Sequence, residues 1–174
     1  MAEAWLRGPV EGVPQGLQPA AHSLIDAVED IERAVAGLTT PQLWMMPGGA
    51  ASVGFHLAHV AGSIDRLLAY ARGEVLSPEQ LQEMKREGEP GDPPLGLEDL
   101  RSRLFAARER ALETYRSTDP DALSEPRLVG RAGLPSTVQG LMFHAAEHAR
   151  RHAGQVVATA AIIRGLDQPG HERT

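Results

Sequence analysis

The stretch His144-Ala-Ala-Glu-His-Ala-Arg-Arg-His-Ala-Gly-Gln155 places three histidines four residues apart. On a helix, each step of four residues turns the position by only about 40°, so the three imidazoles would form one slanted stripe. Neutral imidazole is the commonest metal ligand among side chains, and histidines at i and i+4 can reach one ion. This stretch therefore predicts a long helix with a metal-binding face.

Hydrophobic residues on both sides of this stretch recur at helical spacing, and they predict a last helix from Pro135 to about Arg164. Because a helix interior tolerates proline poorly, the other long gaps between prolines indicate further helices. The same spacing is found over residues 17–38, 52–72 and 97–115. No segment alternates with a period of two, so we expect no strand.

The connection between the second and third long helices contains Ser77-Pro78-Glu79-Gln80, a capping box that predicts a short helix to about Arg86. Residues 87–94 are rich in glycine and proline and predict a mobile loop. Four long helices with short or irregular connections predict an all-α protein, a four-helix bundle with one short extra helix. We expect a single domain over residues 1–174, with the bundle core at about 17–165 and flexible termini.

Composition narrows the class of protein. The 174-residue chain has no cysteine, which excludes disulfides, thiolate metal sites and a cysteine nucleophile, and suits a reducing cytosol. Its formal net charge of −6 at pH 7 argues against nucleic-acid binding. We see no signal peptide, and the longest apolar block, Val156 to Ile163, is far shorter than the roughly 20 residues that span a bilayer. We expect a soluble cytoplasmic protein.

A second histidine cluster, His56-Leu-Ala-His59, lies in the second long helix. Two helices that supply His-x-x-His and His-x-x-x-His could fill three positions of a zinc tetrahedron and leave one open. The alternative is that these histidines pack in the core, where each would need a hydrogen-bond partner. His144 to His148 also fits H-x-x-E-H, an inverted metalloprotease motif with Glu147 as base. A di-iron site is disfavoured because these helices contain no Glu-x-x-His.

Two segments resemble the DinB-like (YfiT-like) family of four-helix bundles. Residues 43–59 are similar to the family's loop into helix two, with a proline-glycine turn, the small polar cap Ser52 and a histidine seven residues later. Residues 147–155 are similar to its helix-four motif, His-x-x-x-His followed by x-Gly-Gln. The order of the two motifs and the four-helix plan agree over nearly the whole chain.

The resemblance implies that His59, His148 and His152 bind one divalent metal ion, most often zinc or nickel in this family. His56 and His144 have no standard counterpart and are additional candidate ligands. The resemblance also implies a homodimer and a metal-dependent hydrolase or a transferase that uses a low-molecular-weight thiol. The side chains expected to support the ligands are Glu147, Gln155 and Asp65, although an exposed ion pair with Arg66 is the simpler role for Asp65.

The sequence thus leads to two hypotheses. In the first, the metal activates water or an external thiol toward a small-molecule substrate. In the second, the chain is a non-catalytic metal-binding or stress-related bundle. Metal content and turnover would distinguish them.

Overall fold

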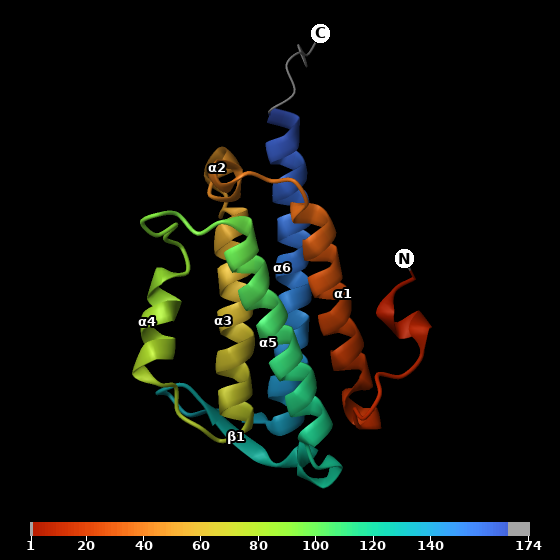
Figure 1. The fold of residues 1–174 in the computed structure, drawn as a ribbon. Coiled ribbons are helices and arrows are strands. Elements are labelled where there is room, and N and C mark those ends of the chain that lie inside the picture. Colours follow the sequence, from red (N-terminus) through yellow and green to blue (C-terminus); the bar gives the residue numbers. More distant parts are fainter. Residues whose placement is uncertain (1, 167–174) are drawn as a thin grey trace.

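Four long helices pack side by side in the computed structural model, which describes residues 2–166 (Figure 1). They are α1 (Gln18–Val35), α3 (Val53–Ala71), α5 (Leu97–Ser117) and α6 (Val138–Leu166). Both α5 and α6 pack against α1 and α3, so the four helices enclose one core. As the colours of Figure 1 show, α1 and α6 run in one direction and α3 and α5 in the other. The predicted all-α four-helix bundle is confirmed.

The crossover between α3 and α5 contains α4 (Pro78–Arg86), the predicted short extra helix. Ser77 and Gln80 form its capping box, as the sequence predicts. None of the residues of α4 is buried, and the helix lies outside the bundle beside α3 (Figure 1). Short helices α2 (Thr40–Leu43) and η3 (Pro47–Gly49) connect α1 to α3 at the end of the bundle where α1 finishes. The Ser52 hydroxyl caps α3 by accepting a hydrogen bond from the Phe55 amide at 3.1 Å.

The core consists of one buried stripe from each long helix. Burial of these side chains supplies the main driving force for folding. Tyr115 is fully buried on α5 and donates a 2.8 Å hydrogen bond to the carbonyl oxygen of Met142 on α6. Burial also raises the pKa of the Tyr115 phenol. Other fully buried members of the core include Leu24, Val28, Ile31, Leu57, Ile64, Leu100, Leu104 and Ile163.

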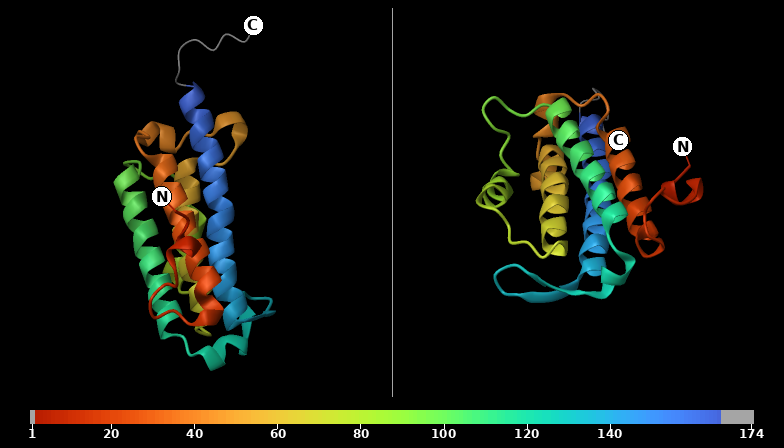
Figure 2. Two further views of the ribbon diagram at one scale, coloured as in Figure 1. Left: turned by 90° about the vertical axis from the view of Figure 1, so that its right-hand side faces the viewer. Right: turned by 60° about the horizontal axis from the view of Figure 1, so that its bottom comes forward.

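A small β-hairpin between α5 and α6 corrects the expectation that the chain has no strand. It follows η4 (Pro120–Ser124), and β1 (Pro126–Val129) pairs antiparallel with β2 (Leu134–Thr137). Each strand has only four residues, which is too short to show a period of two. Each strand also contains a proline. The last helix was predicted to start at Pro135, but Pro135 lies in β2 and α6 begins at Val138. Figure 2 shows the hairpin across the end of the bundle where α3 and α5 finish.

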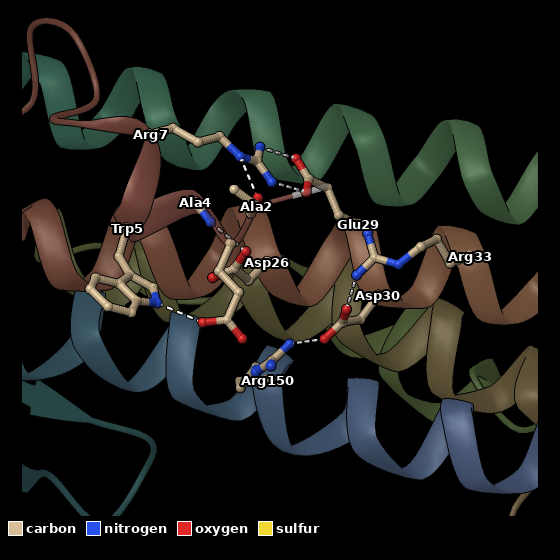
Figure 3. A network of polar contacts seen from close by, with 10 residues as sticks. Ala2, Ala4, Trp5, Arg7, Asp26, Glu29, Asp30, Arg33 and Arg150 are labelled. Atoms are coloured by element: carbon tan, nitrogen blue, oxygen red, sulfur yellow. Dashed lines mark hydrogen bonds and ion pairs between the residues drawn. The ribbon is translucent and has the colours of Figure 1, made fainter.

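The N-terminal segment lies along α1 and includes η1 (Ala4–Arg7) and η2 (Gln15–Leu17). The Ala4 amide donates to Asp26 at 2.8 Å, and the Arg7 guanidinium pairs with both oxygens of Glu29 (Figure 3). The expectation of a flexible C-terminus concerns residues beyond 166, which lie outside the described residues. Between residues 2 and 166, no helix combines the length and apolarity that crossing a membrane requires.

Candidate metal centre

Antiparallel packing of α3 on α6 brings the two histidine clusters together. The Nδ1 atoms of His56 and His152 lie 2.9 Å apart, and so do the Nε2 atoms of His59 and His148. The three-residue step from His56 to His59 on α3 therefore lies beside the four-residue step from His152 back to His148 on α6. Each spacing is about one helical turn, so the two pairs form successive rungs between the helices.

His59, His148 and His152 form the cluster that could hold a metal. Each offers a ring nitrogen, and the three nitrogens lie within 4.8 Å of one another. Two nitrogens bound to one zinc ion in a tetrahedron would lie about 3.4 Å apart, so small side-chain rotations would suffice for ligation. All three side chains are half-buried, which leaves the cluster within reach of solvent.

The environment of the cluster keeps two of these imidazoles neutral. Burial, together with the neighbouring imidazoles, lowers the pKa of His148 and of His152 to about 4. Burial and then His59 also lower the pKa of His56 from its ordinary value. A neutral ring has a lone pair for a metal ion, whereas an imidazolium has none. Near pH 7 His148 and His152 are therefore in the protonation state that metal binding needs.

One buried nitrogen of the cluster has no hydrogen bond to the described residues. The Nδ1 atom of His148 is buried and has no partner among residues 2–166. Leaving a buried polar atom unpaired costs about 1–3 kcal/mol, so such atoms are rare in folded proteins. Hydrogen bonds between side chains therefore do not satisfy every nitrogen of the cluster. A donor set of three imidazoles fits a divalent ion such as zinc or nickel.

Glu87 contacts His59, and sequence analysis did not identify it. Its Oε2 atom lies 2.8 Å from His59 Nδ1, and its Oε1 atom accepts a 2.6 Å hydrogen bond from Arg66. Glu87 and Arg66 are both 8% exposed. Glu87 is thus not part of a free loop, and Arg66 pairs with it in the interior instead of with Asp65 at the surface. A buried charge is normally paired in this way.

The carboxylate of Glu87 faces the Nδ1 atom of His59. Because a carboxylate accepts hydrogen bonds, it favours the tautomer with a proton on Nδ1 and leaves the lone pair on Nε2. That lone pair faces His148. The Phe55 ring stacks on His59, with centroids 5.2 Å apart and planes inclined by 16°, so contacts at the ring face and at Nδ1 both restrict its orientation.

The additional candidate ligands lie at the margin of the cluster. His56 is 4% exposed, and its Nδ1 lies 2.9 Å from Nδ1 of His152. The side chain of His144 is half exposed, and its Nδ1 lies 3.2 Å from a carboxylate oxygen of Glu147. Its ring centroid is 5.6 Å from that of His148. The structure therefore places His144 beside the three clustered nitrogens and not among them.

The side chains expected to support the ligands have other surroundings. Glu147 is bound to Arg151 through contacts of 2.7 and 2.9 Å, and the Arg151 guanidinium lowers the pKa of Glu147. Asp65 accepts a 2.7 Å hydrogen bond from Gln80 of α4. Gln155 is exposed on α6, three residues after His152. The carboxylate that contacts His59 is therefore Glu87, and not Glu147 or Asp65 as the sequence analysis expected.

A cavity of about 840 Å³ opens between α3, α5 and the segment that contains α4. Glu87 and Gly62 line it, together with charged side chains that include Arg86, Arg103 and Arg110. None of the three clustered histidines, nor His56 or His144, is among the described residues that line this cavity. Glu87 thus lines the cavity and also contacts the histidine cluster.

The fold and site define a helical bundle with a three-histidine cluster between two of its helices. A model of the DinB superfamily matches residues 23–156, so the chain belongs to this superfamily. The matched range includes both histidine clusters and Glu87. A crystal structure of a conserved protein from Enterococcus faecalis is similar, with a TM-score of 0.69 and 21% identity over 86% of this chain and 97% of that chain. At this identity the similarity supports the fold alone. No curated protein matches the chain.

Proposed function

We propose that the protein binds one divalent metal ion, zinc or nickel, through His59, His148 and His152. The observation that carries the proposal is the convergence of their nitrogens within 4.8 Å across two helices. The lowered pKa of His148 and of His152 supports it, because both rings are neutral at pH 7. The unpaired Nδ1 atom of His148 supports it as well, because the cluster is not satisfied by its own hydrogen bonds.

Three protein ligands leave one position open in a tetrahedral site, as is usual in catalytic zinc centres. When bound, the ion supplies Lewis-acid chemistry that lowers the pKa of water or of a small-molecule thiol. The chain has no cysteine, so any thiol must be external. Glu87 and Phe55 orient the His59 ring, and His56 orients His152. We therefore propose a metal-dependent hydrolase or a transferase that uses a low-molecular-weight thiol.

A non-catalytic metal-binding role is the alternative, and one observation favours it. Both carboxylates that contact the histidines are engaged by arginine, Glu87 by Arg66 and Glu147 by Arg151. A general base must be free to take a proton, and an arginine partner opposes protonation of a carboxylate. A bundle that only binds or stores metal does not need such a base.

The proposal also includes the partners of the protein and its location. We propose a small-molecule substrate, a cytoplasmic location and a homodimer. The formal net charge of −6 supports the expectation that nucleic acid is not a partner, because a nucleic-acid-binding surface is normally basic.

Metal analysis tests the proposal directly. The protein is purified without chelators, loaded separately with zinc and nickel, and its metal content is measured by mass spectrometry. About one equivalent is expected. Metal at background after loading would refute the metal site. Turnover is then measured with a panel of thiols, electrophiles and hydrolysable esters and amides. Turnover that is lost on chelation and restored by metal supports the enzyme, and stoichiometric metal without turnover supports the non-catalytic alternative.

A further inference from the structure

We infer that Glu87 is a positioning residue of the metal centre, which fixes the tautomer and orientation of His59 from outside the ligand set. The inference rests on the proposed function, because it assumes that His59 is a ligand. It assigns a role in the site to the crossover between α3 and α5, which supplies none of the three clustered histidines.

The geometry of Glu87 leaves it little freedom. One carboxylate oxygen lies 2.8 Å from His59 Nδ1, and the other accepts from Arg66 Nη1 at 2.6 Å. Because the two oxygens hold two different partners, the carboxylate cannot turn without breaking one contact. Histidines that bind metal commonly donate their other N–H to a carboxylate, and loss of such a partner typically costs 10- to 100-fold in metal affinity.

Gly62 leaves room on α3 for this carboxylate. A Cβ atom at Gly62 would lie 2.4 Å from Glu87 Oε1 and 2.7 Å from Arg66 Nη1. Gly62 lies inside a helix, where glycine costs up to about 1 kcal/mol relative to alanine. The close approach of Glu87 and Arg66 explains why a glycine is needed at this position.

Two residues of the α4 segment make polar contacts with α3 in the described part of the chain, and one of them, Glu87, reaches a histidine. Glu87 is the C-cap residue of α4 and contacts His59 and Arg66. Near the other end of α4, Gln80 donates to Asp65. Since no residue of α4 is buried, these polar contacts matter for its position. Asp65 therefore offers a matched control that weakens α4 packing without touching the histidine cluster.

The test compares Glu87→Gln with Asp65→Asn in the full-length protein. The zinc dissociation constant is measured by competition with a chromophoric chelator, and folding is checked by circular dichroism. The glutamine has one acceptor oxygen for two donors, so we expect Glu87→Gln to weaken zinc binding about 10- to 100-fold. Asp65→Asn should leave zinc binding unchanged. An unchanged affinity in Glu87→Gln, or an equal loss in both variants, would overturn the inference.

Gly62→Ala provides a second variant that keeps every charge. Alanine favours the helix, so the chain should fold, but its methyl group must displace Glu87 or Arg66. We expect weaker zinc binding in this variant too, and wild-type affinity would count against the inference.

A measurement without metal separates this inference from the proposed function. Nitrogen-15 NMR of the metal-free protein reports which nitrogen of His59 carries the proton. We expect the proton on Nδ1 in the wild type and a shift toward Nε2 in Glu87→Gln. If the wild type binds no metal, the proposed function fails, but this readout still decides whether Glu87 sets the state of His59. An unaltered tautomer would refute that role.

Discussion

The Nδ1 atoms of His56 and His152 lie 2.9 Å apart, although the two residues are 96 positions apart in the chain. One of the two nitrogens must donate and the other accept, because two lone pairs repel at this distance. Since Nδ1 of His152 is used in this contact, Nε2 is the nitrogen of His152 left for an ion. A His152 that binds metal through Nε2 must therefore be the donor to His56.

This relationship predicts that His56 supports a ligand and is not one itself. His56→Leu should weaken zinc binding about tenfold, because His152 loses the partner that orients it. His56→Asn can still hydrogen-bond from a similar position and should stay close to wild type. Isothermal titration with zinc measures both variants. If His56→Asn lost metal as completely as a ligand variant, His56 would have to be counted as a ligand.

The three clustered histidines should be more sensitive to substitution than their neighbour His144. We expect His148→Ala and His152→Ala to lose zinc on gel filtration, because two remaining ligands hold the ion weakly. His144→Ala should keep about one equivalent, since its ring lies outside the cluster. Elemental analysis of the eluted protein gives the ratio. Retention of metal by His148→Ala would contradict the ligand assignment, as would its loss from His144→Ala.

The metal-free protein should lose stability as the pH falls from about 6.5 to about 4. His148 and His152 have a folded-state pKa of about 4, whereas an unfolded histidine titrates near 6.5. Between these values the unfolded chain binds more protons, so the free energy of unfolding decreases with falling pH. Above pH 6.5 both states are neutral, and the contribution of these histidines no longer changes.

Urea unfolding at several pH values in the presence of a chelator measures this effect. After allowance for partial exposure of the rings, we expect the two histidines to contribute on the order of 2–3 kcal/mol between pH 7 and pH 4. The double variant His148→Asn/His152→Asn is the control, because its remaining pH dependence belongs to other groups. Identical pH profiles for the control and the wild type would refute the lowered pKa values.

Sequence periodicity was sufficient to predict the four long helices, because each of them buries a continuous apolar stripe. Capping chemistry is equally local, so Ser52 and Ser77 were predicted as helix caps from sequence and are observed as such. The hairpin of residues 126–137 was missed because its pairing is a relation between two very short strands. Proline in each strand hid the pattern further.

The candidate site, too, was predicted only in part from the sequence. The local spacing of His148 and His152 is visible in one helix, and the resemblance to a family added His59. The partnership of His59 with Glu87 depends on the path of the crossover, which brings residues 28 positions apart into contact. Gly62 was the available signal, since a glycine inside a helix often marks a close approach of other atoms. Its partners could not be named without the structure.

The loop into α3 offers a last test, because Gly54 faces the Trp44 indole. A Cβ atom at residue 54 would lie 2.8–2.9 Å from three ring carbons, so alanine must displace an indole that donates to the Leu95 carbonyl at 3.0 Å. We expect Gly54→Ala to destabilise the fold by about 1–3 kcal/mol and to change tryptophan fluorescence. Gly154→Ala is the control, since its Cβ would meet no atom within 4 Å and alanine should stabilise α6 by up to about 1 kcal/mol. Equal unfolding free energies for the two variants would show that the indole does not require a glycine beneath it.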